Sequence, residues 1–182
     1  MGYFLDVEHL ETLEKQEKWN EARELLYKMW ENEKLNSEKL IRLFSECWYV
    51  LSLWECCINK EKLSFYAFQN TLIECTEFGI QNHMKKPRFL CIAGYMISMF
   101  PNLFYVNGTD KSYAEWEQNG IDMLRESCEF DPNDRIAKVL FLGTKAGFTE
   151  YRKEKKLLRL ELASFFPNET AIEQYFKEIL NA

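Results

Sequence analysis

Apolar residues recur along most of the chain at spacings of three and four positions, which is typical of helices that bury one face. The clearest run begins after Asn36, a favourable N-cap residue. Its apolar positions are Leu40, Ile41, Phe44, Cys47, Trp48, Leu51, Trp54 and Ile58. This run predicts a long helix that packs one face into the core.

The same pattern predicts seven further helices and a short last one after Pro167, which Thr170 and Glu173 would open as a capping box. The seven cover residues 4–16, 20–33, 64–82, 89–100, 112–129, 134–145 and 150–163. We therefore predict an all-α fold, a single array of about nine mostly antiparallel helices in one domain, residues 1–182.

The segment 89–100 is apolar nearly all round, which places it centrally in the core. Residues 89–109 carry no charge, so a membrane-spanning helix is the alternative. However, the dense apolar run is only 12 residues long and is followed by Pro101 and Asn102. A run this short favours a buried core helix, and we expect no membrane contact.

Composition supports the prediction of a helical fold and of a cytoplasmic location. Only four valines, seven glycines and four prolines occur among 182 residues, whereas strands favour β-branched side chains. The first residues lack the basic and apolar segments of a secretory signal, so we expect a cytoplasmic protein. Six cysteines lie within apolar helical patterns and form no CxxC pair; we expect reduced, buried thiols at Cys47, Cys56, Cys57, Cys75, Cys91 and Cys128.

No motif for catalysis, cofactor or metal binding is present, so the sequence predicts a protein that is not an enzyme and has no cofactor. The two histidines, His9 and His83, have no nucleophile or carboxylate at motif spacing, and no glycine-rich phosphate loop occurs. Trp19, Trp30 and Trp116 lie near turns or polar faces, where an exposed ring would mark an interface.

Charge is unevenly distributed. The net charge of −6 argues against a general nucleic-acid binder. Between Asp110 and Asp134 there are eight acidic and two basic residues. Acids interleaved with aromatic rings suit a Lys/Arg-rich partner, and the alternative is an ordinary solvated helix face. The candidate contact residues are Asp110, Tyr113, Glu115, Trp116, Glu117, Asp122 and Glu126.

Two other charged stretches are weaker candidates. The first is acidic and near the start of the chain, with Asp6, Glu8, Glu11 and Glu14. The second is basic, and its alternative to a solvated helix face is an RNA or phosphate contact; it consists of Arg152, Lys153, Lys155, Lys156 and Arg159.

Two stretches resemble the turns of tetratricopeptide-repeat hairpins. Residues 18–22 (KWNEA) resemble the turn within such a repeat, and residues 129–134 (EFDPND) resemble the turn between repeats. Gly120 and Ser127 fall where that family places small residues, although its 34-residue period is not sustained. The resemblance implies TPR-like packing of paired helices.

A second resemblance concerns function. Residues 38–55 (EKLIRLFSECWYVLSLWE) and 89–104 (FLCIAGYMISMFPNLF) are similar in texture to small acidic immunity proteins. Those proteins are encoded beside bacterial polymorphic and contact-dependent growth-inhibition toxins, and they bind and block a cognate toxin domain, often a basic nuclease. The resemblance implies a non-enzymatic toxin inhibitor with a basic protein partner. The alternative is a TPR-like adaptor that binds a peptide segment.

Overall fold

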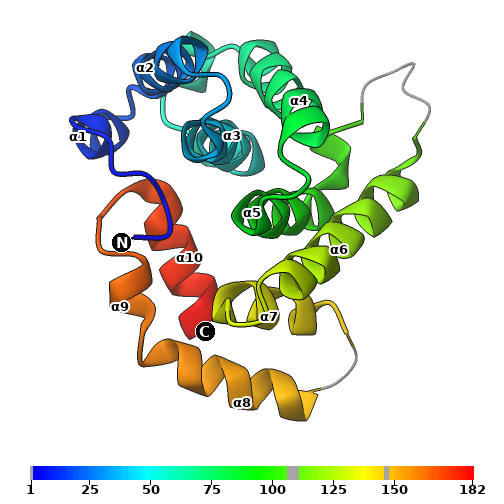
Figure 1. The fold of residues 1–182 in the computed structure, drawn as a ribbon. Coiled ribbons are helices and arrows are strands. Elements are labelled where there is room, and N and C mark those ends of the chain that lie inside the picture. Colours follow the sequence, from blue (N-terminus) through cyan, green and yellow to red (C-terminus); the bar gives the residue numbers. More distant parts are fainter. Residues whose placement is uncertain (1, 106–110, 146–147) are drawn as a thin grey trace.

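A computed structural model describes residues 2–105, 111–145 and 148–182 (Figure 1). These residues form ten α-helices and three short 3₁₀ helices, with no strand among them, so the all-α prediction is confirmed. The α-helices are α1 (Leu10–Lys15), α2 (Trp19–Asn32), α3 (Ser37–Ser52), α4 (Phe65–Asn82), α5 (Pro87–Met99), α6 (Tyr113–Phe130), α7 (Arg135–Gly143), α8 (Phe148–Arg159), α9 (Leu162–Phe165) and α10 (Ala171–Asn181).

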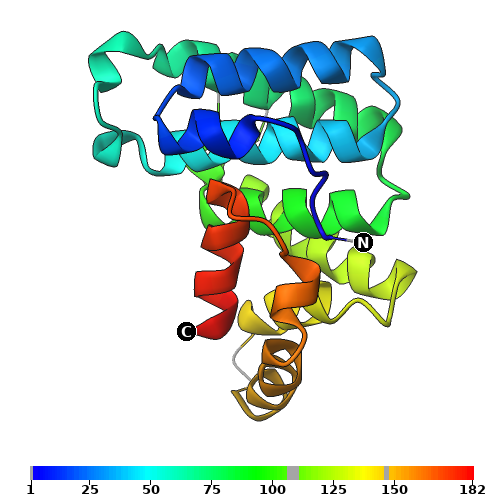
Figure 2. The same ribbon diagram turned by 90° about the vertical axis from the view of Figure 1, so that its left-hand side faces the viewer.

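Helices α1 to α5 run roughly along one direction, and α8 and α10 cross it (Figures 1 and 2). Helix α3 lies between α2 and α4 and above α5. The 89–97 segment of α5 is entirely buried, as its all-apolar sequence predicts. The Trp48 indole Nε1 donates a hydrogen bond to the Met96 carbonyl oxygen at 3.1 Å, which joins α3 to α5. In the described part of the chain, none of the helices is both long enough and apolar enough to cross a bilayer.

The third helix begins where the sequence predicts and ends earlier. The Asn36 Oδ1 accepts hydrogen bonds from the backbone N–H groups of Glu38 and Lys39, as expected of an N-cap. The helix stops at Ser52 rather than at Ile58, and a 3₁₀ turn, Trp54–Cys56, follows. Trp54 instead packs edge-on against Phe65, with ring centroids 5.2 Å apart.

This early end changes one prediction about the cysteines. All six are free thiols, and Cys47, Cys75 and Cys91 are buried as predicted. Cys56 is exposed, because it lies in the 3₁₀ turn rather than inside a continued α3. Cys57 and Cys128 are partly buried.

Residues 2–9 are irregular rather than helical as predicted, since α1 starts only at Leu10. Their apolar side chains are nevertheless buried: the Phe4 ring lies 5.5 Å from that of Phe176 in α10. The Tyr3 backbone N–H donates to the Phe165 carbonyl oxygen at 2.6 Å, and its hydroxyl donates to Asp134 at 2.8 Å. These contacts join the start of the chain to its last third.

A buried ion triad joins α1, α3 and α10. The Arg42 guanidinium, fully buried, contacts the Glu14 carboxylate at 2.6 Å and the Glu46 carboxylate at 3.0 Å. The second Glu14 oxygen accepts the Ala171 backbone N–H at 2.6 Å, which holds the start of α10. Glu14 is therefore structural, and the suggestion that it belongs to an acidic contact surface is wrong.

Burial raises the pKa of Glu46 to about 8, with the nearby Glu14 charge adding to the shift and Arg42 opposing it. Glu46 is thus mostly protonated at neutral pH. The triad then carries one carboxylate and one guanidinium, which is the arrangement that a dry interior tolerates.

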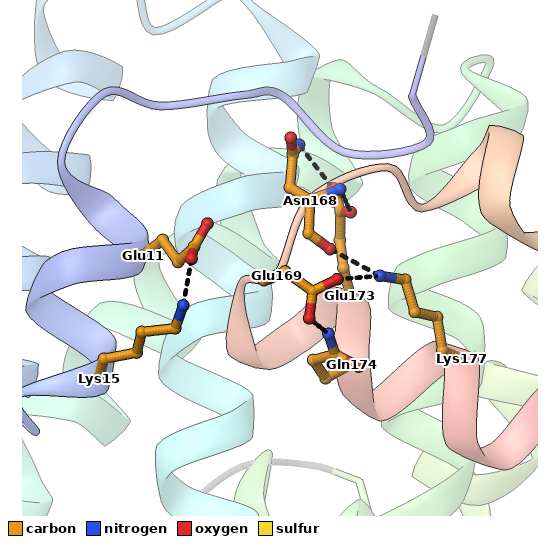
Figure 3. A network of polar contacts seen from close by, with 7 residues as sticks. All are labelled: Glu11, Lys15, Asn168, Glu169, Glu173, Gln174 and Lys177. Carbon is orange, nitrogen blue, oxygen red and sulfur yellow. Dashed lines mark hydrogen bonds and ion pairs between the residues drawn. The ribbon is translucent and has the colours of Figure 1, made fainter.

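The expected capping box at α10 is wrong. Thr170 makes no side-chain cap bond, and Glu173 accepts hydrogen bonds from the Asn168 backbone N–H and side-chain amide, at 2.7 and 3.1 Å. Lys177 donates to the Asn168 carbonyl oxygen at 2.8 Å (Figure 3). The network shown there replaces the local cap with contacts around the turn before α10.

Candidate functional site

Helix α6 packs closely against α5, because the two helices meet at two glycines. A Cβ built at Gly120 would lie 2.5 Å from the Ser98 backbone nitrogen, and one at Gly94 would lie 2.7 Å from the Gly120 carbonyl oxygen. Only glycine allows two helices to come this close. Ser127, one of the other small residues of the repeat-like pattern, is buried and donates to the Pro87 carbonyl oxygen at 2.8 Å.

The start of α6 is fixed by a capping box that the sequence analysis missed. The Ser112 hydroxyl oxygen accepts the Glu115 backbone N–H, and the Glu115 carboxylate accepts the Ser112 backbone N–H at 2.6 Å. These hydrogen bonds lower the pKa of Glu115. Glu115 therefore caps the start of α6 and also contributes to the negative charge of its surface. The S-x-x-E spacing of residues 112–115 was the signal that could have revealed it.

The acids of α6 form an outer face that points away from α5. At 3.6 residues per turn, Glu115, Asp122, Glu126 and Glu129 fall within about 60° of the helix circumference. Arg125 lies among them and pairs with Asp122 at 2.9 Å and more loosely with Glu129 at 3.8 Å. Glu126 has no ion-pair partner among the described residues. This acidic face (Glu115, Asp122, Glu126, Glu129) carries a net charge of −3 once Arg125 is included.

The two predicted aromatic anchors have different surroundings. The Tyr113 side chain is 54% exposed at the start of α6. Trp116 lies on the core side, half-buried, with its ring 5.9 Å from that of Phe104 and the Lys111 ammonium 4.8 Å from its centroid. Trp116 therefore braces α6 rather than projecting from it. Asp110 lies outside the described residues.

Glu117 belongs to a different surface from the other acids. Together with Ile121 it lines a cleft of about 440 Å³, whose other lining residues come from α5, α7, α8 and α10 and from the residue after α7. Sequence reasoning placed Glu117 with the other acids and did not identify this cleft. Its lining is mostly apolar: Tyr95, Ser98, Met99, Glu117, Ile121, Val139, Leu140, Gly143, Thr144, Tyr151, Ile179 and Leu180.

Most polar groups along the cleft are already engaged. The Tyr95 hydroxyl is hydrogen-bonded to that of Tyr175 at 2.7 Å, and burial is the main cause that raises the pKa of Tyr95. The Lys155 ammonium donates to the Tyr151 hydroxyl at 3.0 Å and to the Ile179 carbonyl oxygen at 3.1 Å. Glu117 is exposed and is the one carboxylate of the lining. Within residues 2–105, 111–145 and 148–182, it has no hydrogen-bond or ion-pair partner.

Several other candidates are structural. Trp19 and Trp30 are buried, so neither marks an interface. His83 is buried with its ring between those of Phe78 and Phe89, at 5.9 and 6.1 Å, and this burial lowers its pKa. A grouping of three or more His, Cys, Asp or Glu side chains able to hold a metal ion does not occur in the described ranges.

The basic cluster of α8 is divided between residues that bond to the end of the chain and residues that are exposed. Lys155 holds α8 to α10 through the bonds above, and Arg159 donates to the Asn181 and Ala182 carbonyl oxygens at the chain end. Arg152, Lys153 and Lys156 are exposed on α8. The cluster is thus partly a clamp on α10.

Comparisons with known proteins give no relative. No protein-family model matches the chain, and no curated protein and no solved structure is significantly similar to it.

Proposed function

We propose that this protein is a non-enzymatic immunity protein that binds and neutralises a cognate bacterial toxin domain with a basic surface. The supporting observation is the acidic face of α6. Glu115 and Glu129 are exposed and Asp122 and Glu126 are partly exposed, while the opposite side of the same helix packs closely against α5 at Gly94 and Gly120. A rigid helix that presents fixed charges loses little entropy when a partner binds.

The mechanism is steric and electrostatic. Carboxylates on one helix face attract a surface that normally holds phosphate groups, and complementary charge speeds the encounter. Charges at a rim contribute little affinity by themselves, about 0–1 kcal/mol each. Tight inhibition therefore also needs a buried anchor, and the cleft beside α6 can receive one.

The direct experiment uses the product of the reading frame next to the gene. If that frame encodes a toxin domain, the purified chain should inhibit its activity at one-to-one stoichiometry, with an association rate that falls as salt rises. If an excess of this protein leaves the toxin activity undiminished, the proposal is overturned.

Matched variants test which surface is used. The triple variant D122N/E126Q/E129Q removes three charges from α6 and is expected to weaken inhibition about 10- to 100-fold, at up to about 1 kcal/mol per charge. The control E21Q/E24Q/E31Q removes three exposed charges from α2 and should leave inhibition unchanged. Equal effects of the two variants would show that net charge, not the α6 face, is responsible.

The second candidate function is a TPR-like adaptor that binds a peptide segment, and the apolar cleft favours it. Grooves between stacked helices recognise extended or helical segments through apolar anchors. Affinity isolation from the native host separates the two functions. A single stoichiometric partner whose binding is salt-sensitive supports immunity, whereas several peptides of related sequence support the adaptor.

A further inference from the structure

We infer that the cleft lined by Glu117 binds the side chain of one arginine of the partner, with Glu117 as its counter-ion. The inference rests on the proposed function, because it names the anchor that a basic partner would insert. It depends on three properties of the cleft: its volume, the nature of its walls and the position of its single carboxylate.

The cleft has the size and walls of a binding site. Its volume of about 440 Å³ falls within the range of ligand pockets, roughly 300–1,000 Å³. Ile121, Val139 and Leu140 are among its lining residues, and Met99, which also lines it, is 49% exposed. Such walls suit the methylene stem of a long side chain.

The charge of the cleft selects a cation. Glu117 is the only carboxylate among the described residues that line it, and the acidic face of the same helix adds to the negative potential nearby. The Lys155 ammonium, which lies beside two lining residues, is occupied by the Tyr151 hydroxyl and the Ile179 carbonyl oxygen. A cation that enters would therefore supply the ion-pair partner that Glu117 lacks among the described residues.

Arginine fits this cleft better than lysine. Its guanidinium is more weakly hydrated than an ammonium, pairs with a carboxylate in a planar fork and stacks on aromatic rings. Two tyrosine rings, Tyr95 and Tyr151, are among the lining residues. Arginine is also among the residues enriched at the energetic centres of protein interfaces.

The test uses a small probe, n-butylguanidinium, in place of the unidentified partner. Titration into ¹⁵N-labelled protein should shift the backbone amide signals of residues around the cleft, such as Ser98, Ile121 and Leu180, with a saturable millimolar affinity. The neutral analogue n-butylurea, similar in shape, should bind at least fivefold more weakly, because it cannot form the ion pair with Glu117.

Three variants make the test specific. Glu117→Gln should weaken binding of n-butylguanidinium about fivefold and leave n-butylurea unaffected. Glu126→Gln, which removes a carboxylate from the outer face of the same helix, should change neither. Gly143→Phe should block both probes, because Gly143 lines the cleft and a Cβ there meets nothing nearer than the Tyr151 ring at 3.6 Å, so the added ring would fill the cleft.

Several results would overturn the inference: no saturable shift of the cleft amides, equal binding of the two probes, or a Glu117→Gln variant that binds n-butylguanidinium as well as the wild type. The titration contains no partner, so its outcome is separate from the inhibition assay. Normal inhibition without probe binding contradicts the role of the cleft. Normal probe binding in a chain that inhibits no toxin contradicts the proposed function.

Discussion

Gly120→Ala should destabilise the protein, although alanine favours helix formation. The added Cβ would lie 2.5 Å from the Ser98 backbone nitrogen and 2.6 Å from the Gly94 carbonyl oxygen. Ordinary van der Waals contact begins at about 3.4 Å, so α5 and α6 must separate by about 1 Å. The atoms in the way belong to the backbone of α5 and cannot rotate aside.

Two opposing effects set the change in the free energy of unfolding. Overpacking of a close helix contact costs about 1–3 kcal/mol, and rigid backbone neighbours place Gly120 at the upper end. The gain in helix propensity from glycine to alanine returns about 1 kcal/mol. The net loss is therefore about 2 kcal/mol, equivalent to a fall of about 4–8 °C in Tm for a chain of this size.

Urea unfolding followed by far-UV circular dichroism measures this loss, and Gly143→Ala is the matched control. A Cβ at Gly143, the last residue of α7, would meet only the Tyr151 ring at an unstrained 3.6 Å. This variant should be as stable as the wild type or up to about 1 kcal/mol more stable. A Gly120→Ala variant that is as stable as the wild type would refute the close approach of α5 and α6.

Three further predictions concern buried charge and capping. Arg42→Met leaves the Glu14 carboxylate buried without a counter-ion beside the protonated Glu46 and should cost about 3–5 kcal/mol in urea unfolding. Glu46 keeps its proton in the folded state up to about pH 8 but loses it near pH 4.5 when unfolded, so its stabilising contribution is complete below pH 4.5 and is lost as pH rises to 8. Glu46→Gln should therefore unfold with a weaker pH dependence across this window. Ser112→Ala removes the capping box with Glu115 and should cost about 1 kcal/mol, measured by thermal unfolding.

Each of these predictions has a result that would contradict it. An Arg42→Met variant as stable as the wild type would mean that the two carboxylates are not buried together. Identical pH profiles for wild type and Glu46→Gln would place an ordinary pKa on Glu46. For the cap, Ser112→Thr is the control, because it keeps the hydroxyl and should retain most of the stability.

Local sequence patterns predict much of the helical fold, because the signals that start helices act over a few residues. The Asn36 side chain begins α3 by accepting hydrogen bonds from the backbone N–H groups two and three residues later. Pro87 occupies the first position of α5, where its missing N–H costs nothing. The end of α3 was missed because the apolar spacing continues through Trp54. Its turn toward Phe65 is a tertiary contact that periodicity cannot reveal.

Long-range contacts account for the other differences. The start of α10 is held by a distant residue, since the Ala171 backbone N–H donates to Glu14, 157 residues earlier in the chain. The i, i+4 spacing of Arg42 and Glu46 is compatible with an ion pair on one helix face, but nothing in the sequence indicates that both side chains are buried. Tyr3 and Phe4 are buried without helix because the last helices cover them.

The candidate site was predicted as one surface and is divided between two. The sequence places acids and aromatic residues together over residues 110–134, but helical geometry separates them around the axis of α6. Glu126 faces outward, Glu117 faces the cleft and Trp116 faces Phe104. Sequence proximity could not reveal the cleft, because four of its five walls come from other helices.

Hydrogen exchange of this protein with and without its toxin partner tests the central claim most directly, because it maps the contact surface without a substitution. Binding through α6 predicts slower exchange over residues 113–130 and over the cleft wall at residues 139–144, with residues 19–32 of α2 unchanged. Protection confined to α2 or to the exposed face of α8, with α6 exchanging as in the unbound protein, would contradict the claim.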